Sequence, residues 1–393
     1  MTPLGLISVT TYFSRTREHQ LASTMKSESQ IPPIAFFVPS VIGGGAQRVF
    51  VTLANTLVDM TAHPIHLVVI RDGGEFWSEV RPEVEIVNLG ASRMRYALPA
   101  LTRYLQTVRP QALCSTLTYC NVVTILAWRL AGRPCRLLVR EANVVRKEES
   151  VRRALMRLTY PQADHVIALS PELHSNILDA NVPVRDSIAT IGNPALDFQA
   201  IERTTAALDF LPRPNPRFIC AVGSLTYQKG FDTLLTAFAR LSDTSVHLVI
   251  LGEGELRPSL EAQSEKLGIA HRVHLVGFVA RPTDIVQHAS LFVLSSRWEG
   301  FPNVLLEALG TGVPVVATDC PGANRSILRD GELGHLADPD DPDALAHSIA
   351  EALTDPRATP TERQERAQEF AAPKIAREYL DLFGAASKTA PER

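Results

Sequence analysis

Residues 291–318, LFVLSSRWEGFPNVLLEALGTGVPVVAT, contain two apolar runs that flank a segment with helical spacing. The apolar runs predict buried strands, and the Leu- and Ala-rich stretch between them predicts a helix. Glu299 and Glu307 stand eight positions apart at the entrance of that helix. Because a buried carboxylate is costly unless it is paired or hydrogen-bonded, either both glutamates point to solvent or they hold a polar group.

The same alternation of short apolar runs and longer helical segments extends outward from this stretch. IAFFVP (34–39) and HVIALS (165–170) predict strands, and AQRVFVTLANTLVDM (46–60) predicts a helix after the first of them. Strands separated by about a dozen helical residues favour βαβ units, and hence parallel sheets with helices on both faces. The proline-rich segment LPRPNPR (211–217) interrupts the pattern, so it predicts a linker between two α/β domains.

We therefore expect two Rossmann-like domains that face each other across a cleft. A chain of 393 residues is long enough for two such cores. Ligands of open α/β sheets bind at the carboxyl ends of the strands, so the loops there are the candidate sites. The expected parts are a disordered tail over 1–30, a first domain over 31–200, a linker over 201–216, a second domain over 217–360, and a C-terminal helix over 361–393 that crosses back to the first domain.

The composition is that of an ordinary globular protein, with 45% apolar and 21% charged residues. Basic residues are in excess over 31–200 and acidic residues over 201–393, so the first domain is the one expected to meet an anionic surface. The five cysteines form no CxxC motif and are expected to be reduced core thiols of a cytoplasmic protein. The sequence contains no apolar stretch of about 18 residues, so no membrane span is expected.

Two glycine-containing loops that follow strands are candidate phosphate sites. In GGG (43–45), glycines allow close backbone approach, and the helix that follows offers free N–H groups. This loop lacks the G-x-G-x-x-G spacing and a Walker lysine, which disfavours a Rossmann oxidoreductase. In GSLTYQKG (223–230), Lys229 lies at the start of the next helix and can neutralise a phosphate. The alternatives are a flexible turn at the first loop and a solvated lysine at the second.

The stretch around the two glutamates is the third candidate. Pro302 suits a helix start, where its missing N–H costs nothing. A helix that starts near Asn303 points its first N–H groups, and the positive end of its dipole, into the cleft. Glu307 then lies on the same helix face as Asn303, and Glu299 lies in the loop before it. Carboxylates suit sugar hydroxyls and a helix start suits phosphate, which fits a nucleotide sugar; the alternative is two exposed helix-start glutamates.

At these residues the chain resembles a known family. The E-x7-E pattern in EGFPNVLLEALGTGVPVVATDCPG, with GSLTYQKGFDTLLTAF and GGGAQRVFVTLAN, resembles the retaining GT-B glycosyltransferases of family 4, over residues 34–384. The resemblance implies a GT-B fold, with an acceptor-binding first domain and a nucleotide-sugar-binding second domain. It implies transfer of a hexosyl or N-acetylhexosaminyl group from a UDP- or GDP-sugar, with retention of configuration and without a metal or other cofactor.

The resemblance also assigns roles to residues. Lys229, on the donor diphosphate, and Glu299, near the donor sugar hydroxyls, are the expected catalytic residues. Glu307 is expected to bind the ribose hydroxyls, and main-chain N–H groups near it the diphosphate. The full set of expected donor-binding residues is Gly44, Gly45, Ser224, Lys229, Phe278, Glu299, Phe301, Asn303, Val304 and Glu307.

Ser224 departs from the family pattern, because such proteins usually have arginine there and a bidentate phosphate donor is lost. Either another arginine, such as Arg325, supplies the charge, or activity is lowered.

A front-face reaction is expected, in which the departing diphosphate oxygen takes the acceptor's proton. DPDD (338–341) lies in a proline turn, so no metal site is expected. The rival interpretations are a non-catalytic nucleotide-sugar-binding protein and a nucleotide-sugar epimerase of the same architecture.

Basic and apolar residues alternate in VRKEESVRRALMRLTY (145–160), which predicts an amphipathic helix for an anionic lipid surface, or a solvated helix. LTYCNVV and REAN resemble first domains of relatives that extend lipid-linked sugars, and Glu141, Asn143 and Arg146 are the candidate acceptor-binding residues. The expected protein is cytoplasmic, peripheral on the inner face of the cell membrane, and does not bind nucleic acid. It would act on a lipid-linked glycan in cell-surface polysaccharide or glycoconjugate synthesis. The base, the sugar, the linkage and the oligomeric state stay open.

Overall fold

The computed structural model describes most of the chain between residues 31 and 386. The expected tail over 1–30 and most of the expected linker over 201–216 lie outside the described residues, as do Gly43 and Gly44, so the predictions made for them stay predictions. The described residues are 31–40, 45–71, 73–74, 76–184, 188–195, 208, 210–211 and 216–386.

The first half of the chain forms a seven-stranded parallel sheet, with strands β1 (Ile34–Val38), β2 (Ile65–Val69), β3 (Val84–Asn88), β4 (Ala112–Thr116), β5 (Arg136–Glu141), β6 (His165–Ala168) and β7 (Ile188–Thr190). Their order is β3-β2-β1-β4-β5-β6-β7, so the direction of winding reverses between β1 and β4. Every residue of β1 is buried, as expected of a strand that helices cover on both faces.

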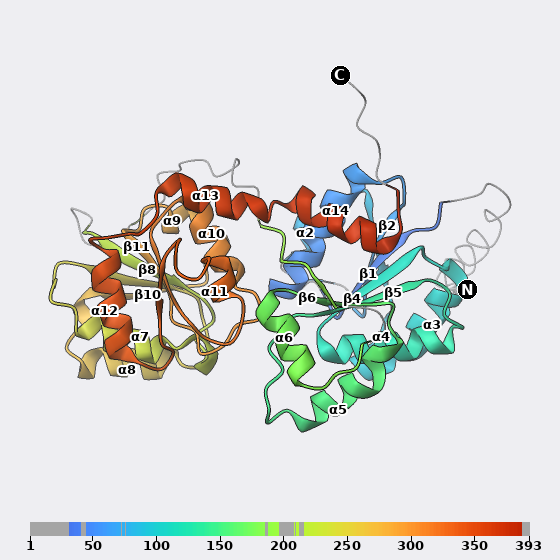
Figure 1. Cartoon of the computed structure of the whole chain (residues 1–393), viewed down its shortest axis with the longest axis horizontal. Coiled ribbons are helices and arrows are strands. Elements are labelled where there is room, and N and C mark those ends of the chain that lie inside the picture. The colour runs from blue at the N-terminus through green and yellow to red at the C-terminus, as the bar shows by residue number, and fades with distance from the viewer. Residues whose placement is uncertain are drawn as a thin grey trace, which may run out of the picture.

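The helices of the first half that cover this sheet are α2 (Gly45–Met60), α3 (Ala97–Val108), α4 (Thr118–Leu130), α5 (Ser150–Thr159) and α6 (Pro171–Asp179). In Figure 1, α3, α4 and α5 lie together on the lower side of the sheet, away from α2. The alternation of side chains along β1 explains the two layers. Phe36 packs with Phe50 of α2, whereas the next residue, Phe37, belongs to the core beneath α3 and α4.

The second half forms a six-stranded parallel sheet in the order β10-β9-β8-β11-β12-β13, which again reverses once, between β8 and β11. Residues 291–318 form a strand, a helix and a strand, as the sequence predicted. The strands are β8 (Phe218–Val222), β9 (His247–Leu251), β10 (Val273–Gly277), β11 (Leu291–Leu294), β12 (Val315–Thr318) and β13 (His335–Ala337). The helices are α7 (Phe231–Ala239), α8 (Arg257–Lys266), α9 (Thr283–Val286), α10 (Asn303–Thr311), α11 (Asn324–Ile327) and α12 (Pro342–Ala352).

The C-terminal segment, predicted as one helix, is two helices: α13 (Pro360–Glu369) and α14 (Ala372–Phe383). α13 packs against α10 in the second domain and α14 against α2 in the first, so the segment does cross between them (Figure 1). The helix is interrupted because Pro373 has no N–H to donate back to α13, while the carbonyl of Phe370 accepts the Ala195 N–H at 2.7 Å.

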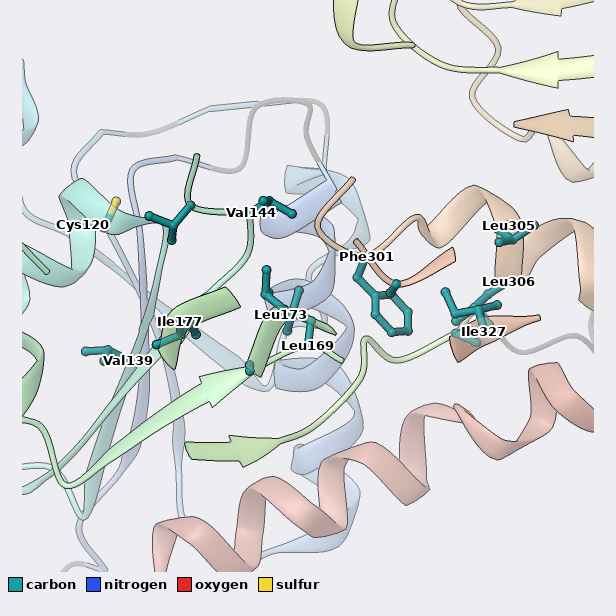
Figure 2. Packing of buried hydrophobic residues seen from close by; sticks show 14 of the residues in the cluster. Cys120, Val139, Val144, Leu169, Leu173, Ile177, Phe301, Leu305, Leu306 and Ile327 are labelled. Carbon is teal, nitrogen blue, oxygen red and sulfur yellow. The ribbon is translucent and has the colours of Figure 1, made fainter. Parts of the chain in front are cut away.

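The buried core runs without interruption from the first domain into the second. In Figure 2 the ring of Phe301 lies between Leu169 and Leu173 of the first domain and Leu306 and Ile327 of the second. Phe301 is 8% exposed and directly precedes Pro302 and α10. The packing between the domains therefore fixes where α10 begins.

Candidate functional site

The loops that follow β8 and β11 come together where the second sheet reverses its strand order. Lys229 ends a 3-10 turn in the first loop, and Glu299 lies in the second. The Lys229 Nζ donates to Glu299 Oε1 at 2.6 Å, and the Ser296 Oγ donates to the same oxygen at 2.6 Å. Glu299 is only 5% exposed, so this buried carboxylate is paired, as the cost of an isolated buried charge requires.

Backbone contacts fix the position of this pair. Gly230 has φ +62°, and a Cβ there would lie 2.1 Å from the carbonyl oxygen of Ser295, so only glycine lets the two loops approach this closely. The Ser295 Oγ donates to the carbonyl of Lys229 at 2.8 Å. The Glu299 N–H donates to the carbonyl of Pro321 at 2.8 Å. Both charged side chains therefore project from loops whose backbones are held against each other.

The start of α10 lies next to the pair. The helix begins at Asn303, and no side chain caps it. The first N–H groups of a helix have no acceptor within it, so those of Asn303 and Val304 lie at the positive end of the dipole and can receive an anion. Gly45 begins α2 in the first domain, and a Cβ added there would lie 3.4 Å from Asn303 Nδ2. One helix start from each domain thus meets at Asn303.

Glu307 lies one turn into α10 and is 8% exposed. Burial raises the pKa of its carboxyl, and Arg48 of α2 opposes this shift, with its Nη1 3.8 Å from Glu307 Oε1. Within the described part of the chain no hydrogen bond reaches this carboxylate. Residues of α2, of 194–195 and of α10 enclose a small pocket around the two side chains. Glu307 is therefore a buried carboxylate that faces Arg48 and has no hydrogen-bond donor among the described residues.

Two family profiles match this chain. The profile of the glycosyl transferases group 1 matches residues 205–372, and that of the glycosyl transferase 4-like domain matches residues 44–194. The chain belongs to the group 1 glycosyltransferases. It is 29% identical over 369 residues to the N-acetylgalactosamine-N,N'-diacetylbacillosaminyl-diphospho-undecaprenol 4-alpha-N-acetylgalactosaminyltransferase of Campylobacter jejuni, across 88% of this chain and 98% of that protein. It is 28% identical over 352 residues to the lipopolysaccharide core biosynthesis glycosyltransferase LpsE of Rhizobium meliloti, across 86% and 96%.

Solved structures agree on the architecture. Anabaena HepE in complex with UDP and glucose matches with a TM-score of 0.77 at 21% identity, over 90% of this chain and 99% of that one. The lipopolysaccharide outer core galactosyltransferase WaaB in its apo form matches with a TM-score of 0.71 at 19% identity, over 90% and 99%. The fold of this glycosyltransferase is therefore GT-B, with two Rossmann-like domains, as the sequence predicted.

In this glycosyltransferase Ser224 lies exposed in the loop after β8. Arg325, the suggested substitute for a missing arginine, donates its Nε to Asp319 Oδ1 at 3.0 Å. Arg297, which follows β11, donates two hydrogen bonds to the carboxylate of Asp232, with N–O distances of 2.9 and 2.8 Å. Both guanidinium groups are thus engaged by carboxylates. Lys229 is the cation that contacts Glu299.

Phe278, one of the expected donor-binding residues, directly follows β10 and is 67% exposed. Gly277 before it has φ +96°, and its carbonyl accepts the Gly252 N–H at 2.8 Å. The turn leaves the Phe278 ring open at the carboxyl end of the second sheet. A flat base could stack there, at the same edge as Lys229.

On the acceptor side, Glu141 is completely buried. Its Oε2 accepts hydrogen bonds from Thr118 Oγ1 at 2.9 Å and from the hydroxyl of Tyr160 at 2.6 Å. Its Oε1 accepts from Arg152 Nη2 at 2.9 Å and from the N–H of Ala142 at 3.1 Å. All of these partners come from the first domain. In this structure Glu141 positions the loop that follows it, and its carboxylate is not exposed in the cleft.

That loop brings the two other acceptor candidates to the donor side. A Cβ on Gly300 would lie 1.7 Å from the carbonyl oxygen of Ala142 and 3.3 Å from the Cα of Asn143, so the loop touches the segment that contains Glu299. The Arg146 guanidinium lies 4.8 Å from the centre of the Trp298 ring. Asn143 and Arg146 are both exposed. Both side chains therefore lie exposed beside the loop that contains Glu299.

Sequence reasoning missed Arg48, Arg140 and Asn193. Arg48 lies in the first turn of α2, inside the quoted stretch GGGAQRVFVTLAN, and its position on that helix was the available signal. Arg140 is a charged residue near the end of the apolar strand RLLVRE, where it is fully buried. Such a residue in a buried strand needs a partner. No sequence signal pointed to Asn193.

Proposed function

We propose that this group 1 glycosyltransferase transfers a sugar from a nucleotide-sugar donor, with retention of configuration, to a lipid-linked glycan acceptor. The observation that supports this most directly is the Lys229–Glu299 pair at 2.6 Å beside the uncapped start of α10. Glu307, one turn into that helix, is buried and accepts no hydrogen bond from the described residues. Carboxylates on both sides of a helix start suit the hydroxyls and the diphosphate of a nucleotide sugar.

In the proposed reaction the bond between the sugar C1 and the diphosphate oxygen breaks while the acceptor oxygen bonds to C1 on the same face. The acceptor's proton passes to the departing diphosphate oxygen, so no side chain forms a covalent bond. Lys229 and the first N–H groups of α10 stabilise the negative charge of the leaving group. Glu299 accepts from the sugar hydroxyls while it holds Lys229 in place. The chain contributes positioning and charge stabilisation.

A thermal-shift panel of UDP- and GDP-sugars tests the donor class, because a ligand that binds only the folded state raises the melting temperature.

Glu307→Gln should raise the donor KM with little change in kcat, and Lys229→Ala should lower kcat. Unchanged constants in both variants would contradict the site. Binding without transfer would favour the non-catalytic alternative, and isomerisation of the donor without acceptor would favour the epimerase. Nuclear magnetic resonance of the product tests retention, and an inverted anomer would exclude it.

Metal independence is part of the proposal. In the part of the chain that the structure describes, no group of three or more His, Cys, Asp and Glu residues is placed to hold a metal ion. We expect the same transfer rate in EDTA as in Mg²⁺ or Mn²⁺, and a rate abolished by EDTA would refute this part.

Ser224 offers a direct test of the missing arginine. Ser224→Arg places a bidentate phosphate donor in the exposed loop after β8 and should raise kcat. Ser224→Gln is the matched control, because it adds a long polar side chain without a charge. An equal effect of both substitutions would show that the charge at this position does not limit turnover.

For the acceptor, the name of the Campylobacter jejuni relative specifies a diphospho-undecaprenol carrier, and we propose a lipid-linked glycan of that class. α5 supplies a surface that suits a membrane, since Val151 is 67% and Leu158 is 73% exposed. Two of its predicted basic residues turn inward: Arg152 contacts Glu141, and Arg157 donates to a backbone carbonyl. Among the described helices none is long and apolar enough to cross a bilayer. We propose peripheral binding to the anionic inner face of the cell membrane.

Co-sedimentation with vesicles tests this surface. The full-length protein should bind vesicles that contain phosphatidylglycerol more strongly than pure phosphatidylcholine vesicles. Replacement of Val151 and Leu158 by Asp should abolish binding, because both exposed apolar contacts are lost. Leu267→Asp, at a 36% exposed leucine of the second domain, is the control and should bind normally. Equal loss in the control, or normal binding of the double variant, would contradict the assignment of α5.

A further inference from the structure

The side chain of Arg140 lies in the interior of the first domain, near the carboxyl end of β5, and it is fully buried. Its Nη1 donates to Thr116 Oγ1 at 2.8 Å, and its Nη2 donates to Asn193 Oδ1. Its Nε is buried and has no hydrogen-bond acceptor in the part of the chain that the structure describes. Among the residues described, no carboxylate forms an ion pair with this guanidinium. Arg140 is therefore a buried positive charge whose partners are neutral.

Such a charge is costly in the free protein. Arginine stays protonated at any physiological pH, so burial cannot neutralise it as it can a lysine or a histidine. The ring of Phe50 has its centre 5.9 Å from the guanidinium carbon and supplies only a weak counter-field. Replacement of buried charged groups by apolar side chains of similar volume is often neutral or stabilising. An anion that binds nearby would offset the cost.

Asn193 connects this charge to the donor side. Its Nδ2 donates to Asn303 Oδ1 at 2.7 Å, and Asn303 is the first residue of α10. The start of α2, at Gly45, lies against the same asparagine. The guanidinium, the two amides and two helix N-termini thus form one positive region that spans both domains. We call Arg140, Asn193 and Asn303 the interdomain relay.

We propose that Arg140 is a positioning residue whose charge is balanced by the diphosphate of the bound nucleotide sugar, and that the interdomain relay couples donor binding to the contact between the two domains. This inference rests on the proposed function, because it assigns the anion to the donor. It predicts a double signature. Arg140→Met removes a charge that destabilises the free protein and stabilises the donor-bound protein. The melting temperature of the free protein should therefore stay the same or rise, while the donor affinity falls.

The test compares the full-length wild type with Arg140→Met and Arg140→Lys, using UDP and GDP as separate probes. Melting temperatures and calorimetric affinities are measured with and without each probe. We expect Arg140→Met to melt no lower than the wild type and to bind the preferred nucleoside diphosphate about tenfold or more weakly, a typical coupling between sites. Arg140→Lys keeps the charge and should retain most of the affinity.

Arg363 provides a matched control, because it is 1% exposed and, among the described residues, it donates only to backbone carbonyls, including Gly312 at 3.1 Å and Pro356 at 3.3 Å. Arg363→Met should lower the melting temperature and leave affinity unchanged. A fall in melting temperature of Arg140→Met like that of the control, or wild-type affinity in Arg140→Met, would overturn the inference.

A further variant separates the relay from the charge. Asn193→Ala keeps Arg140 and breaks the hydrogen bond to Asn303, so it should also weaken binding of the probe. It keeps the inference testable if Arg140→Met does not fold, and wild-type affinity in Asn193→Ala would then reject the relay. If the wild type binds neither UDP nor GDP, the proposed donor class fails and the inference fails with it. If the wild type binds and the variants bind equally well, only the inference fails.

Discussion

Replacement of Lys229 by Met tests whether the Lys229–Glu299 pair is a balanced unit. The 2.6 Å separation of Nζ and Oε1 corresponds to an attraction of about 6 kcal/mol at an effective dielectric constant of ~20. The side chains are 16% and 7% exposed, so desolvation offsets much of this attraction. Removal of one partner from a buried pair costs about 3–5 kcal/mol. Because Ser296 still donates to Glu299, we expect a loss near the lower limit, about 3 kcal/mol.

The opposite single variant and the double variant complete the cycle. Glu299→Gln leaves a lysine that is 16% exposed and can turn to water, so the expected loss is about 1–2 kcal/mol. The variant with both substitutions leaves no unpaired charge and should lose about 2 kcal/mol, which gives a coupling energy of about 2–3 kcal/mol.

Urea unfolding measures these losses. Of the three tryptophans, only Trp298 lies in the second domain, so a background with Trp77→Phe and Trp128→Phe makes its fluorescence report that domain. The midpoint and slope of the transition give the free energy of unfolding. The same losses correspond to about 2–4 °C in melting temperature per kcal/mol for a domain of this size. Single losses that add to the double loss within about 0.5 kcal/mol would refute the reasoning, because the charges would then be independent.

Three further perturbations probe the frame around the site. A Cβ on Gly300 would lie 1.7 Å from the carbonyl oxygen of Ala142, so Gly300→Ala should force the domains apart and lower kcat about tenfold or more; wild-type kcat would contradict this. Burial lowers the pKa of both His247 and His274, whose ring nitrogens lie 2.8 Å apart. Their folded pKa values lie below the unfolded value, so the stability they contribute is complete above pH 6.5 and is lost as the pH falls. Urea midpoints at pH 5 and 7.5 should show a loss that His274→Phe reduces, and an undiminished loss in that variant would speak against the pair. Thr359→Ala breaks the capping box of α13 and should cost about 1 kcal/mol in thermal unfolding, whereas an unchanged melting temperature would show that the cap is dispensable.

The fold could be predicted from the sequence because strands that are buried on both faces leave continuous apolar runs. β11 and β12 are buried along their whole length. They are parallel neighbours, so the stretch between them forms a crossover that contains a helix. The interruption of the C-terminal helix could not be predicted in the same way. Pro373 is acceptable in the first turn of α14, and the backbone bond that divides the segment comes from Ala195, far away in the chain.

The candidate site was likewise predictable from the sequence only in part. Lys229 and Glu299 were predicted as the catalytic residues from the family resemblance. In the structure β8 and β11 are neighbours in the sheet, so the loops that follow them bring both residues to the same edge. Glu141 follows a strand in the same way, yet it is enclosed by side chains of α4 and α5 and by Tyr160. Sequence position gives the edge at which a residue lies. Side-chain packing from other elements decides whether that residue is exposed there.

The pairing of Arg48 with Glu307 bears on how the proposed donor would join the two domains. The two side chains come from different domains and approach to 3.8 Å, too far for a hydrogen bond. The Arg48 Nε lies 3.8 Å from Glu79 Oε2 and has no hydrogen-bond acceptor among the described residues. Both groups are largely withdrawn from water, so each loses hydration without a full replacement. Ribose hydroxyls between them would donate to Glu307 and accept from Arg48, and would convert a poor contact between the domains into a satisfied one. Donor binding and closure of the cleft would then favour each other, and the reaction would begin only in a cleft from which water is excluded.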